Sequence, residues 1–441
     1  MADNLIKEAV SLRRQGLREK ALKLLEDYCL ENPGDLDMTT TLKVWKKEVV
    51  TESWAMSRRD PNRSSCDRDL GEWSRLIGLW SYEFSSLFIQ KFLPNIPSPI
   101  IANDMVIVPN SNLQSFIGFG VNDGCPLPST KVLGGRLSYA STPVYIKPFL
   151  IFTLNGVLYH ISFGKDKLSL NQFISDQRIQ LISYCAPMAN EEIAVFGFAD
   201  WILLYKPHTG EARFIPYKLT REDDRLLSPI QWEDEVVFLS RFGQLLRVVF
   251  PEDDLDNAKL SMEEINGRIK DMVYSAPCLV KGRLYFESVN SKSSRNICEY
   301  SLSRNGSFRT EVLEEGVCSP KDTHLYFSPI AFQEGVIVSS DIESKLYYIQ
   351  GGYPMRVIPI NIELARGSLR VHQTSHIFAF ALDNYLIGKV PKGFFCLNLL
   401  HSNEGMIEIF RPATDIIAQP ISYSHRVFFI TKASVKCYAT K

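Results

Sequence analysis

The sequence predicts a mainly β protein: a β-propeller of seven or eight blades, with eight favoured, preceded by a short α-helical segment. Three observations lead to this fold class. A short phrase containing proline recurs along most of the chain, and short β-type apolar runs alternate with turn residues from Glu72 onward. Helical periodicity, in contrast, is confined to the start of the chain.

The recurring phrase is first found over Ser98–Val108. A small residue and a proline open a short apolar strand, a few polar or turn-forming residues follow, and a second β-branched or aromatic run closes it. Successive copies are about 42 to 52 residues apart and the last gap is about twice as long, which is typical of a repeat architecture. The prolines of these copies are Pro99, Pro143, Pro187, Pro229, Pro277, Pro329 and Pro420.

Each copy carries the pattern of a β-hairpin. In the second copy we expect strands over Thr142–Ile146, Phe149–Thr153 and Val157–Ile161, with Asn155-Gly156 joining the last two. Asn-Gly between apolar runs is a strong hairpin signal because both central residues of the turn need positive φ. The proline costs no hydrogen bond where a strand begins. The same plan with other turn residues is expected over Arg241–Val249, Pro277–Phe286 and Asp341–Ile349.

The number of copies sets the number of blades. Three or four strands in about 44 residues make one blade of a closed ring. The long last gap leaves room for a copy without its proline, near Val371–Phe380, which brings the count to eight. The final copy has room for two strands before the chain ends, and we expect Leu79–Phe84 to complete that blade and close the ring. Seven blades would result if the degenerate copy is only an insertion.

The first 55 residues form the predicted helical segment. Apolar positions predict two helices that meet near Gln15–Leu17, with Pro33-Gly34 ending the second. This order of small, large, Gly and Pro residues resembles a tetratricopeptide repeat over about 34 residues. A third helix, about Asp37–Val50, would cover the apolar face. An ordinary helical hairpin is the alternative interpretation.

The polar stretch that follows is expected to be a linker. Residues 56–72 are charged and rich in turn formers, so they bury too little apolar surface to order themselves. The pair Arg58-Arg59 suggests an acidic or nucleic-acid partner, but nearby aspartates offset its charge. The predicted domains are therefore the helical segment at 1–55, the linker at 56–72 and the propeller at 73–441.

Composition excludes several classes of protein. The net charge is −1, whereas proteins that neutralise nucleic-acid phosphates carry a basic excess, so we expect no nucleic-acid partner. No apolar run approaches the length of a membrane-spanning helix, so no membrane insertion is expected. The stretch Met1–Pro33 does not read as an export signal. The nine cysteines include no Cys-x-x-Cys pair, which favours reduced thiols and a cytoplasmic location.

The repeat pattern resembles that of pyrroloquinoline-quinone-like propellers. The resemblance rests on the small-Pro-apolar strand, the Val-Tyr/Phe and Leu-Tyr strands after it, and a Thr209-Gly210 turn in one copy, and it covers roughly residues 95 to 441. That superfamily includes quinoprotein dehydrogenases as well as non-enzymatic scaffolds such as outer-membrane assembly lipoproteins. The resemblance therefore implies a fold and leaves the activity open.

The sequence shows no catalytic or cofactor site. The family's enzymes hold the quinone between a Trp and a pair of adjacent cysteines, with Ca²⁺ nearby, and this chain has no Cys-Cys pair. Trp201 and Trp232 lie in predicted strands or turns, so a packing role is expected. His372 and His376 have the spacing of a helical metal site but lie in a strand-like stretch, where that spacing loses its meaning. We therefore expect no cofactor, no metal and no enzymatic activity.

Additions to the propeller plan are candidates for recognition. The acidic stretch Glu252–Asn257 lacks the Gly and final Glu of a calcium loop, and we expect it to open an insertion with a short amphipathic helix over Asn257–Ile269. A second addition lengthens the gap between Pro277 and Pro329. Insertions in repeat proteins cluster on one face, often the binding face. A bulky loop residue such as Phe242 is either a partner anchor or, more simply, closes its own hairpin.

These observations favour a non-enzymatic scaffold that binds other proteins through the propeller or the helical segment. By analogy, such cytoplasmic propellers belong to bacterial multi-protein systems. The alternative is a ligand-binding or enzymatic propeller with its site at the central channel, which converging titratable side chains would indicate. A secreted or membrane-tethered assembly factor is disfavoured because it requires an export signal. Interaction residues, partner and oligomeric state stay unknown at this stage.

Overall fold

A computed structural model shows a mainly β chain with one long described helix, α2 (Arg18–Glu31). The residues that the structure describes are 5, 9, 18–32, 34–35, 38–39, 42, 66–67, 76–84, 99–110, 115–128, 141–179, 185–249, 255–265, 272–273, 275–290, 294–303, 306–315, 329–332, 334–339, 345–350, 356–361, 379–382, 385–390, 393–398, 407–410, 421–423, 426–431 and 433–440.

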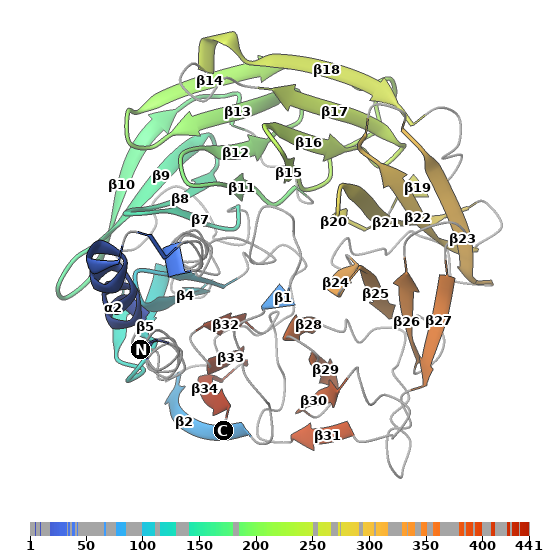
Figure 1. Ribbon diagram of the computed structural model, residues 1–441. Helices are drawn as coiled ribbons and strands as arrows, with labels where there is room; N and C mark the ends of the chain where they lie inside the picture. Colours follow the sequence, from blue (N-terminus) through green and yellow to red (C-terminus); the bar gives the residue numbers. More distant parts are fainter. Residues whose placement is uncertain are drawn as a thin grey trace.

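The described strands form eight sheets, numbered here in chain order and arranged as a ring (Figure 1). Sheet 1 consists of β3 (Ile100–Ala102), β4 (Met105–Asn110), β5 (Ser115–Gly120) and β6 (Pro126–Pro128). Sheet 2 consists of β7 (Val144–Ile146), β8 (Phe149–Leu154), β9 (Val157–Phe163) and β10 (Leu168–Ser175). Sheet 3 consists of β11 (Met188–Ala189), β12 (Ala194–Gly197), β13 (Trp201–Lys206) and β14 (Glu211–Pro216). Sheet 4 consists of β15 (Ile230–Trp232), β16 (Glu235–Leu239), β17 (Gln244–Val249) and β18 (Lys259–Glu264).

The remaining sheets continue the ring. Sheet 5 consists of β19 (Met272–Val273) and β20 (Cys278–Val280), which both pair with β21 (Arg283–Val289), then β22 (Arg295–Ser301) and β23 (Phe308–Glu314). Sheet 6 consists of β24 (Ile330–Phe332), β25 (Gly335–Ser339), β26 (Lys345–Gln350) and β27 (Arg356–Asn361). Sheet 7 consists of β28 (Ala379–Leu382), β29 (Tyr385–Val390), β30 (Gly393–Asn398) and β31 (Ile407–Phe410), joined by β1 (Cys66–Asp67). Sheet 8 consists of β32 (Ile421–Tyr423), β33 (Arg426–Ile430), β34 (Ser434–Thr440) and β2 (Leu76–Glu83).

The proline phrase lies at the inner end of the sheets. In seven sheets the proline immediately precedes the innermost strand, for example Pro143 before β7, where its missing N–H breaks no ladder. The small residues beside it make hydrogen bonds. Ser141 Oγ accepts the Thr153 N–H of the second strand at 2.9 Å, and Ser228 Oγ accepts the Ala186 N–H of the neighbouring sheet at 2.9 Å. The phrase therefore links strands within a sheet and between sheets.

The predicted hairpin of the second copy is confirmed. Strands β7, β8 and β9 coincide with the three predicted runs, and β8 pairs with β9 in antiparallel register. Asn155 and Gly156 have φ of 46° and 82°. Both central residues therefore occupy the left-handed region that this two-residue turn requires. Lys281 and Gly282, at 48° and 71°, make the same kind of turn between β20 and β21.

The ring is closed by the two ends of the propeller sequence. The N-terminal strand β2 pairs along β34 in antiparallel register, from Leu76↔Thr440 to Glu83↔Ser434. Trp80 fixes this strand further, because its indole N–H donates to the Val121 carbonyl of sheet 1 at 3.1 Å. The expectation that Leu79–Phe84 completes the last blade is therefore confirmed.

Sheet 7 is the copy without a proline. Its strand β28 begins at Ala379, at the end of the interval 371–380 where the degenerate copy was expected. Strand β1 runs parallel to β28, pairing Cys66↔Ala381 and Asp67↔Leu382, and lies near the centre of the ring (Figure 1). Two residues of the expected linker 56–72 thus form a strand, while the boundaries of the linker and of the domains stay predictions.

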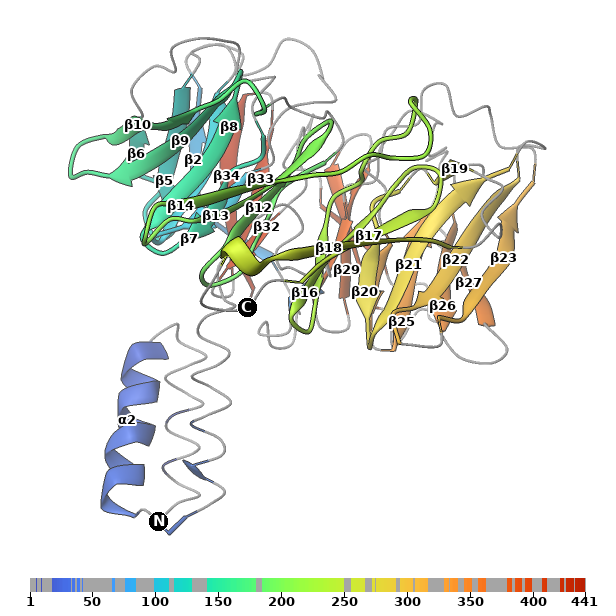
Figure 2. The same ribbon diagram turned by 90° about the horizontal axis from the view of Figure 1, so that it is seen from above.

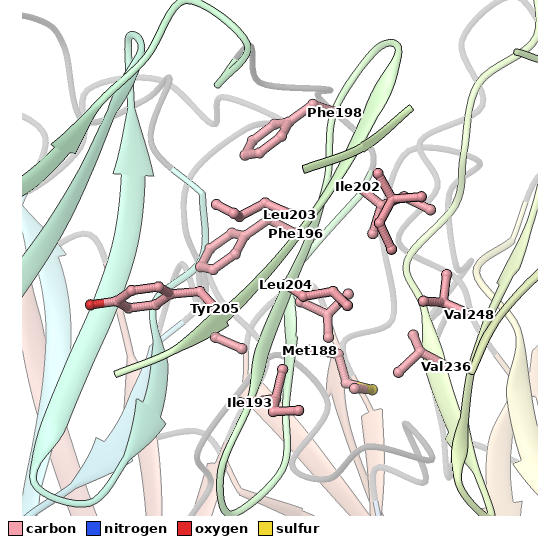
Figure 3. Packing of buried hydrophobic residues seen from close by; sticks show 14 of the residues in the cluster. Met188, Ile193, Phe196, Phe198, Ile202, Leu203, Leu204, Tyr205, Val236 and Val248 are labelled. Atoms are coloured by element: carbon pink, nitrogen blue, oxygen red, sulfur yellow. The ribbon is translucent and has the colours of Figure 1, made fainter. Parts of the chain in front are cut away.

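The hydrophobic core lies between the sheets. Both faces of sheet 3 are buried: one packs on sheet 2 and the other on sheet 4, as Figure 3 shows for the side chains around β12 and β13. Further clusters join sheets 8 and 1, 1 and 2, 4 and 5, and 5 and 6. Because sheets 1 to 5 are covered on two faces, their middle strands are continuous apolar runs such as Ile202–Tyr205.

Helix α2 lies away from the ring, beyond one of its faces (Figure 2). Its Leu25 is buried against Ala9, Met38 and Leu42, which come from segments before and after the helix. Asp35 accepts the Met38 N–H at 3.1 Å, which is an N-cap interaction where a helical segment begins. No helix among the described residues is long and apolar enough to span a membrane.

The expectation of an amphipathic helix over Asn257–Ile269 is wrong for its described part. Leu255–Asn257 form a short 3₁₀ helix, η2, and Lys259–Glu264 form β18, which pairs with β17 over its whole length. In so short a stretch, the pattern of charged and apolar residues fits the period of a helix as well as that of a strand. Pairing with β17 decides the outcome, because it satisfies the backbone of both strands and seats Leu260 on the sheet 3 core.

Candidate functional site

Trp201 and Trp232 pack between sheets, as expected from the sequence. Trp201 makes an edge-on contact with Phe214, with 6.5 Å between ring centroids, and the Arg178 guanidinium lies 5.3 Å from the Trp201 ring. Trp232 packs on the core between sheets 4 and 5, with the Arg247 guanidinium 5.4 Å away. His372 and His376 and the acidic residues 252–254 lie outside the described residues.

Phe242 closes its own hairpin. Its ring is covered by the Arg221 guanidinium at 3.6 Å. Its N–H donates to Asp224 Oδ1 at 3.2 Å, and the same carboxylate accepts the Ser240 hydroxyl at 2.7 Å. Burial raises the pKa of Asp224, against the lowering effect of these hydrogen bonds. These contacts of Phe242 are all made to residues around its own turn, which favours a structural role for its ring.

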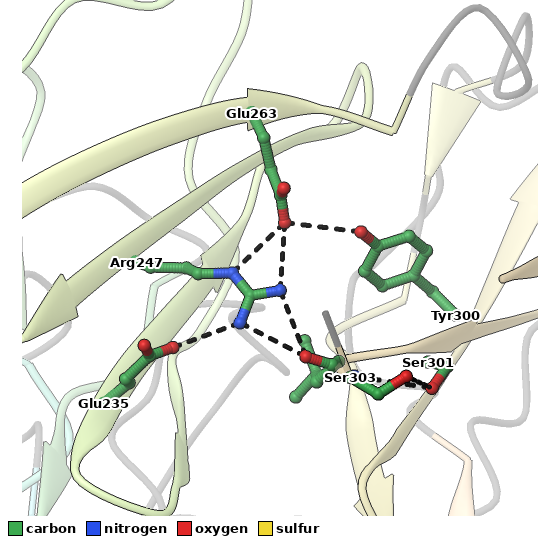
Figure 4. Close-up of polar contacts among 7 residues, drawn as sticks. Glu235, Arg247, Glu263, Tyr300, Ser301 and Ser303 are labelled. Atoms are coloured by element: carbon green, nitrogen blue, oxygen red, sulfur yellow. Dashed lines mark hydrogen bonds and ion pairs between the residues drawn. The ribbon is translucent and has the colours of Figure 1, made fainter. Parts of the chain in front are cut away.

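The most connected polar group links sheets 4 and 5 (Figure 4). Arg247 donates to Glu263 at 3.0 and 3.1 Å, to Glu235 at 3.1 Å and to the Leu302 carbonyl at 3.4 Å. Glu263 also accepts the Tyr300 hydroxyl at 3.3 Å. These carboxylates raise the pKa of Arg247 although burial opposes them. The donors of Arg247 are engaged by two carboxylates of its own sheet 4 and by the Leu302 carbonyl of sheet 5, so the group works as a structural link.

A second group of charges is buried between sheets 5 and 6. Arg295 is 0% exposed and its Nε donates to Glu287 Oε2 at 2.6 Å. Glu299 accepts the Tyr285 hydroxyl at 2.9 Å and lies 3.5 Å from Arg309 Nη1. Buried charges persist only when they are paired and hydrogen-bonded, as these are. Burial keeps Arg295, Glu287 and Glu299 from external ligands.

A third group lies at the outer part of the interface between sheets 2 and 3 and reaches the surface. His160 Nε2 and the Tyr205 hydroxyl are 2.8 Å apart. The Phe173 ring stacks flat on His160, with 4.6 Å between centroids and 4° between planes. Phe149 contacts both His160 and His208 through centroid distances of 5.4 and 5.1 Å. We name these five residues the Phe173 patch.

The patch combines a rigid base with an exposed apolar surface. His160 is 7% exposed, and burial lowers its pKa to about 4, so the imidazole is neutral at pH 7. Burial also raises the pKa of Tyr205, so the hydroxyl stays protonated. Phe173 is 48% exposed and His208 is exposed. An exposed aromatic ring held by packed neighbours is the arrangement found at binding hot spots.

Within the described ranges, no three His, Cys, Asp or Glu side chains come together as a metal site would require. The Phe173 patch is therefore a candidate for binding by contact and shape. The sequence did not single it out, because His160 and Tyr205 belong to different copies. Their separation is 45 residues, which is about one repeat period, so aligning the copies would have brought them to adjacent sheets.

The sheets and their closure define a β-propeller, and the comparisons agree. A europium-containing methanol dehydrogenase superposes with a TM-score of 0.51 at 9% identity, covering 88% of this chain and 98% of that one. The computationally designed Ika8 protein gives a TM-score of 0.50 at 12% identity, covering 80% and 98%. BamB from Moraxella catarrhalis gives a TM-score of 0.47 at 11% identity, covering 83% and 100%.

The first two likenesses support the β-propeller fold that the repeat pattern predicted. At 9 and 12% identity they show the fold alone. No protein-family model matches the sequence, and no curated protein matches it either.

Proposed function

We propose that this protein is a non-enzymatic scaffold, an eight-bladed propeller with a tetratricopeptide-like helical segment, that binds a protein partner at the Phe173 patch. The observation that carries the proposal is the half-exposed Phe173 ring, seated on the buried His160–Tyr205 pair. Aromatic residues held in this way lose little conformational entropy on binding and contribute strongly to protein interfaces.

The other polar groups support a binding role over a catalytic one. Those of Arg247, Arg295 and Asp224 are engaged in links within and between sheets. The patch itself pairs a neutral imidazole with a protonated phenol under an apolar surface, which suits contact with another protein's side chains. We further propose that the scaffold belongs to a cytoplasmic multi-protein system of the kind found in bacteria. Cell fractionation tests the cytoplasmic location.

Affinity capture from the native host tests the proposal. The full chain, a deletion of residues 1–60, Phe173→Ser and the control Met262→Ser are compared by mass spectrometry of the bound proteins. Met262 is 40% exposed on the outer strand of sheet 4 and matches Phe173 as an exposed apolar residue. A partner that is retained by the control and lost with Phe173→Ser supports the patch.

Other outcomes redirect or reject the proposal. A partner lost only with the deletion would move the interface to the helical segment. If no protein is captured by the full chain, the scaffold proposal fails. A small ligand that binds the full chain in that case would favour the alternative of a ligand-binding or enzymatic site at the central channel.

A further inference from the structure

The outer strand of sheet 2 differs from the outer strands of the other sheets. Each sheet ends in one strand whose outer edge has no partner strand among the described residues. In seven sheets that strand carries a charge or a proline, which are devices that prevent unwanted pairing at an exposed edge. These seven strands are β2 (LIGLWSYE), β6 (PLP), β14 (EARFIP), β18 (KLSMEE), β23 (FRTEVLE), β27 (RVIPIN) and β31 (IEIF).

Strand β10 has neither. Its sequence, LSLNQFIS, is eight residues long and contains no charged residue and no proline. Leu168–Gln172 pair regularly with β9, so this stretch has the straight backbone that a further strand needs. The register shifts between Gln172 and Ile174, and the bulge there turns the Phe173 ring onto His160. Asn171, Gln172 and Phe173 are all exposed.

The charges at the two ends of β10 differ. Lys165 and Lys167 are exposed at its start and form no ion pair with a described residue, with only Asp166 between them. At its other end Asp176 is already held by Arg178, whose Nε and Nη2 donate to both carboxylate oxygens. The start of the edge is therefore positive and the far end is neutral. An added strand meets the least repulsion with its acidic end beside the two lysines.

We propose that β10 binds an extended segment of another protein as an added antiparallel strand. An apolar residue of that segment covers Phe173, and acidic residues at its C-terminal end lie beside Lys165 and Lys167. Main-chain hydrogen bonds supply affinity and the two side-chain contacts supply specificity. This inference rests on the proposed function and names the kind of partner that the Phe173 patch takes.

A second copy of this chain fits the edge less well. Two β10 strands paired antiparallel would place Lys165 and Lys167 of one copy beside Asp176 of the other. That carboxylate is already neutralised by Arg178 within its own chain. The charge at the start of the strand therefore favours a partner with free carboxylates.

A labelled peptide tests the inference on the full chain. The probe is fluorescein-Thr-Val-Thr-Phe-Thr-Val-Glu-Glu, and the matched probe ends in Lys-Lys; binding is followed by fluorescence anisotropy. We expect the acidic probe to bind at least tenfold more tightly than the basic one. Asn171→Lys, which adds the missing charge at an exposed position, weakens binding at least tenfold, whereas the control Met262→Lys leaves it unchanged. The double variant Lys165→Glu, Lys167→Glu reverses the preference between the probes.

Hydrogen exchange supplies the backbone readout. Binding of the acidic probe slows amide exchange within residues 168–173 if a strand is added. Absence of probe binding, or binding without this protection, overturns the inference. Dimerisation of the free chain that Asn171→Lys abolishes would assign the edge to a second copy instead. If the captured partner is lost with Phe173→Ser while the probe fails to bind, the scaffold function stands and strand addition falls.

Discussion

Lowering the pH should weaken the interface between sheets 2 and 3 through one buried imidazole. Burial lowers the pKa of His160 to about 4, from 6.5 for the free side chain. In the unfolded chain the imidazole takes up a proton below pH 6.5, whereas in the folded chain it stays neutral down to about pH 4. The unfolded state therefore binds more protons in this window, and folding stability falls as the pH falls through it.

The pKa difference sets the size of the effect. At about 1.4 kcal/mol per pH unit, a gap of this size lowers the free energy of unfolding by about 3 kcal/mol between pH 6.5 and 4. This is an upper value, because relaxation that admits water to His160 would reduce it. His160→Gln removes the titrating group and leaves an amide near the Tyr205 hydroxyl.

Urea unfolding at pH 7.5, 6.0 and 5.0 measures the effect. The free energy of unfolding of the natural chain should drop more steeply with falling pH than that of His160→Gln. His208→Gln is the matched control, since His208 also contacts Phe149 but is exposed. It should keep the steep dependence. If His160→Gln and the natural chain lose stability in parallel, the imidazole is not the titrating group and the argument is refuted.

Three further predictions follow from the fold. Arg247→Met should destabilise the chain by about 2 kcal/mol, since it leaves the partly buried Glu235 and the exposed Glu263 without their cation. A double-mutant cycle with Tyr300→Phe should show coupling, and additive losses would contradict the network. Gly335→Ala should lower the unfolding midpoint strongly, because an added Cβ would lie 1.9 Å from the Ile349 carbonyl oxygen; an unchanged thermal melt would count against this packing. A chain starting at residue 74 should stay soluble and resist protease, whereas one starting at residue 90 lacks β2 and should be cleaved rapidly; equal resistance would show that β2 is dispensable.

Local turn chemistry made much of the ring predictable. Asn155-Gly156 identified its hairpin because few residue pairs adopt positive φ twice in succession, and the structure has that geometry. The proline before each inner strand marked the start of that strand for a similar reason, since its missing N–H restricts where it can lie in a sheet. Both signals depend only on neighbouring residues.

Where neighbours along the chain do not decide the structure, the sequence was less informative. Lys259–Glu264 has no local feature that separates strand from helix, and its pairing with β17 settles the matter. The pair of His160 and Tyr205 depends on the packing of sheet 2 against sheet 3. The exposed edge of β10 became visible only when the outer strands of all sheets were compared. Position within the assembled ring, more than residue type, defines the candidate site.

The pairing of β2 with β34 also orders events during synthesis. Strand β2 precedes sheets 1 to 7 in the sequence and its partner β34 follows them, so β2 is synthesised well before the strand with which it pairs. Forming a contact between strands so far apart in the sequence has a large loop-closure entropy cost, which makes ring closure slow. Until then the open edge of β2 and the uncovered face of sheet 1 are the surfaces most exposed to misassembly. The pairing that closes the finished ring therefore also leaves the growing chain with surfaces open to misassembly until it forms.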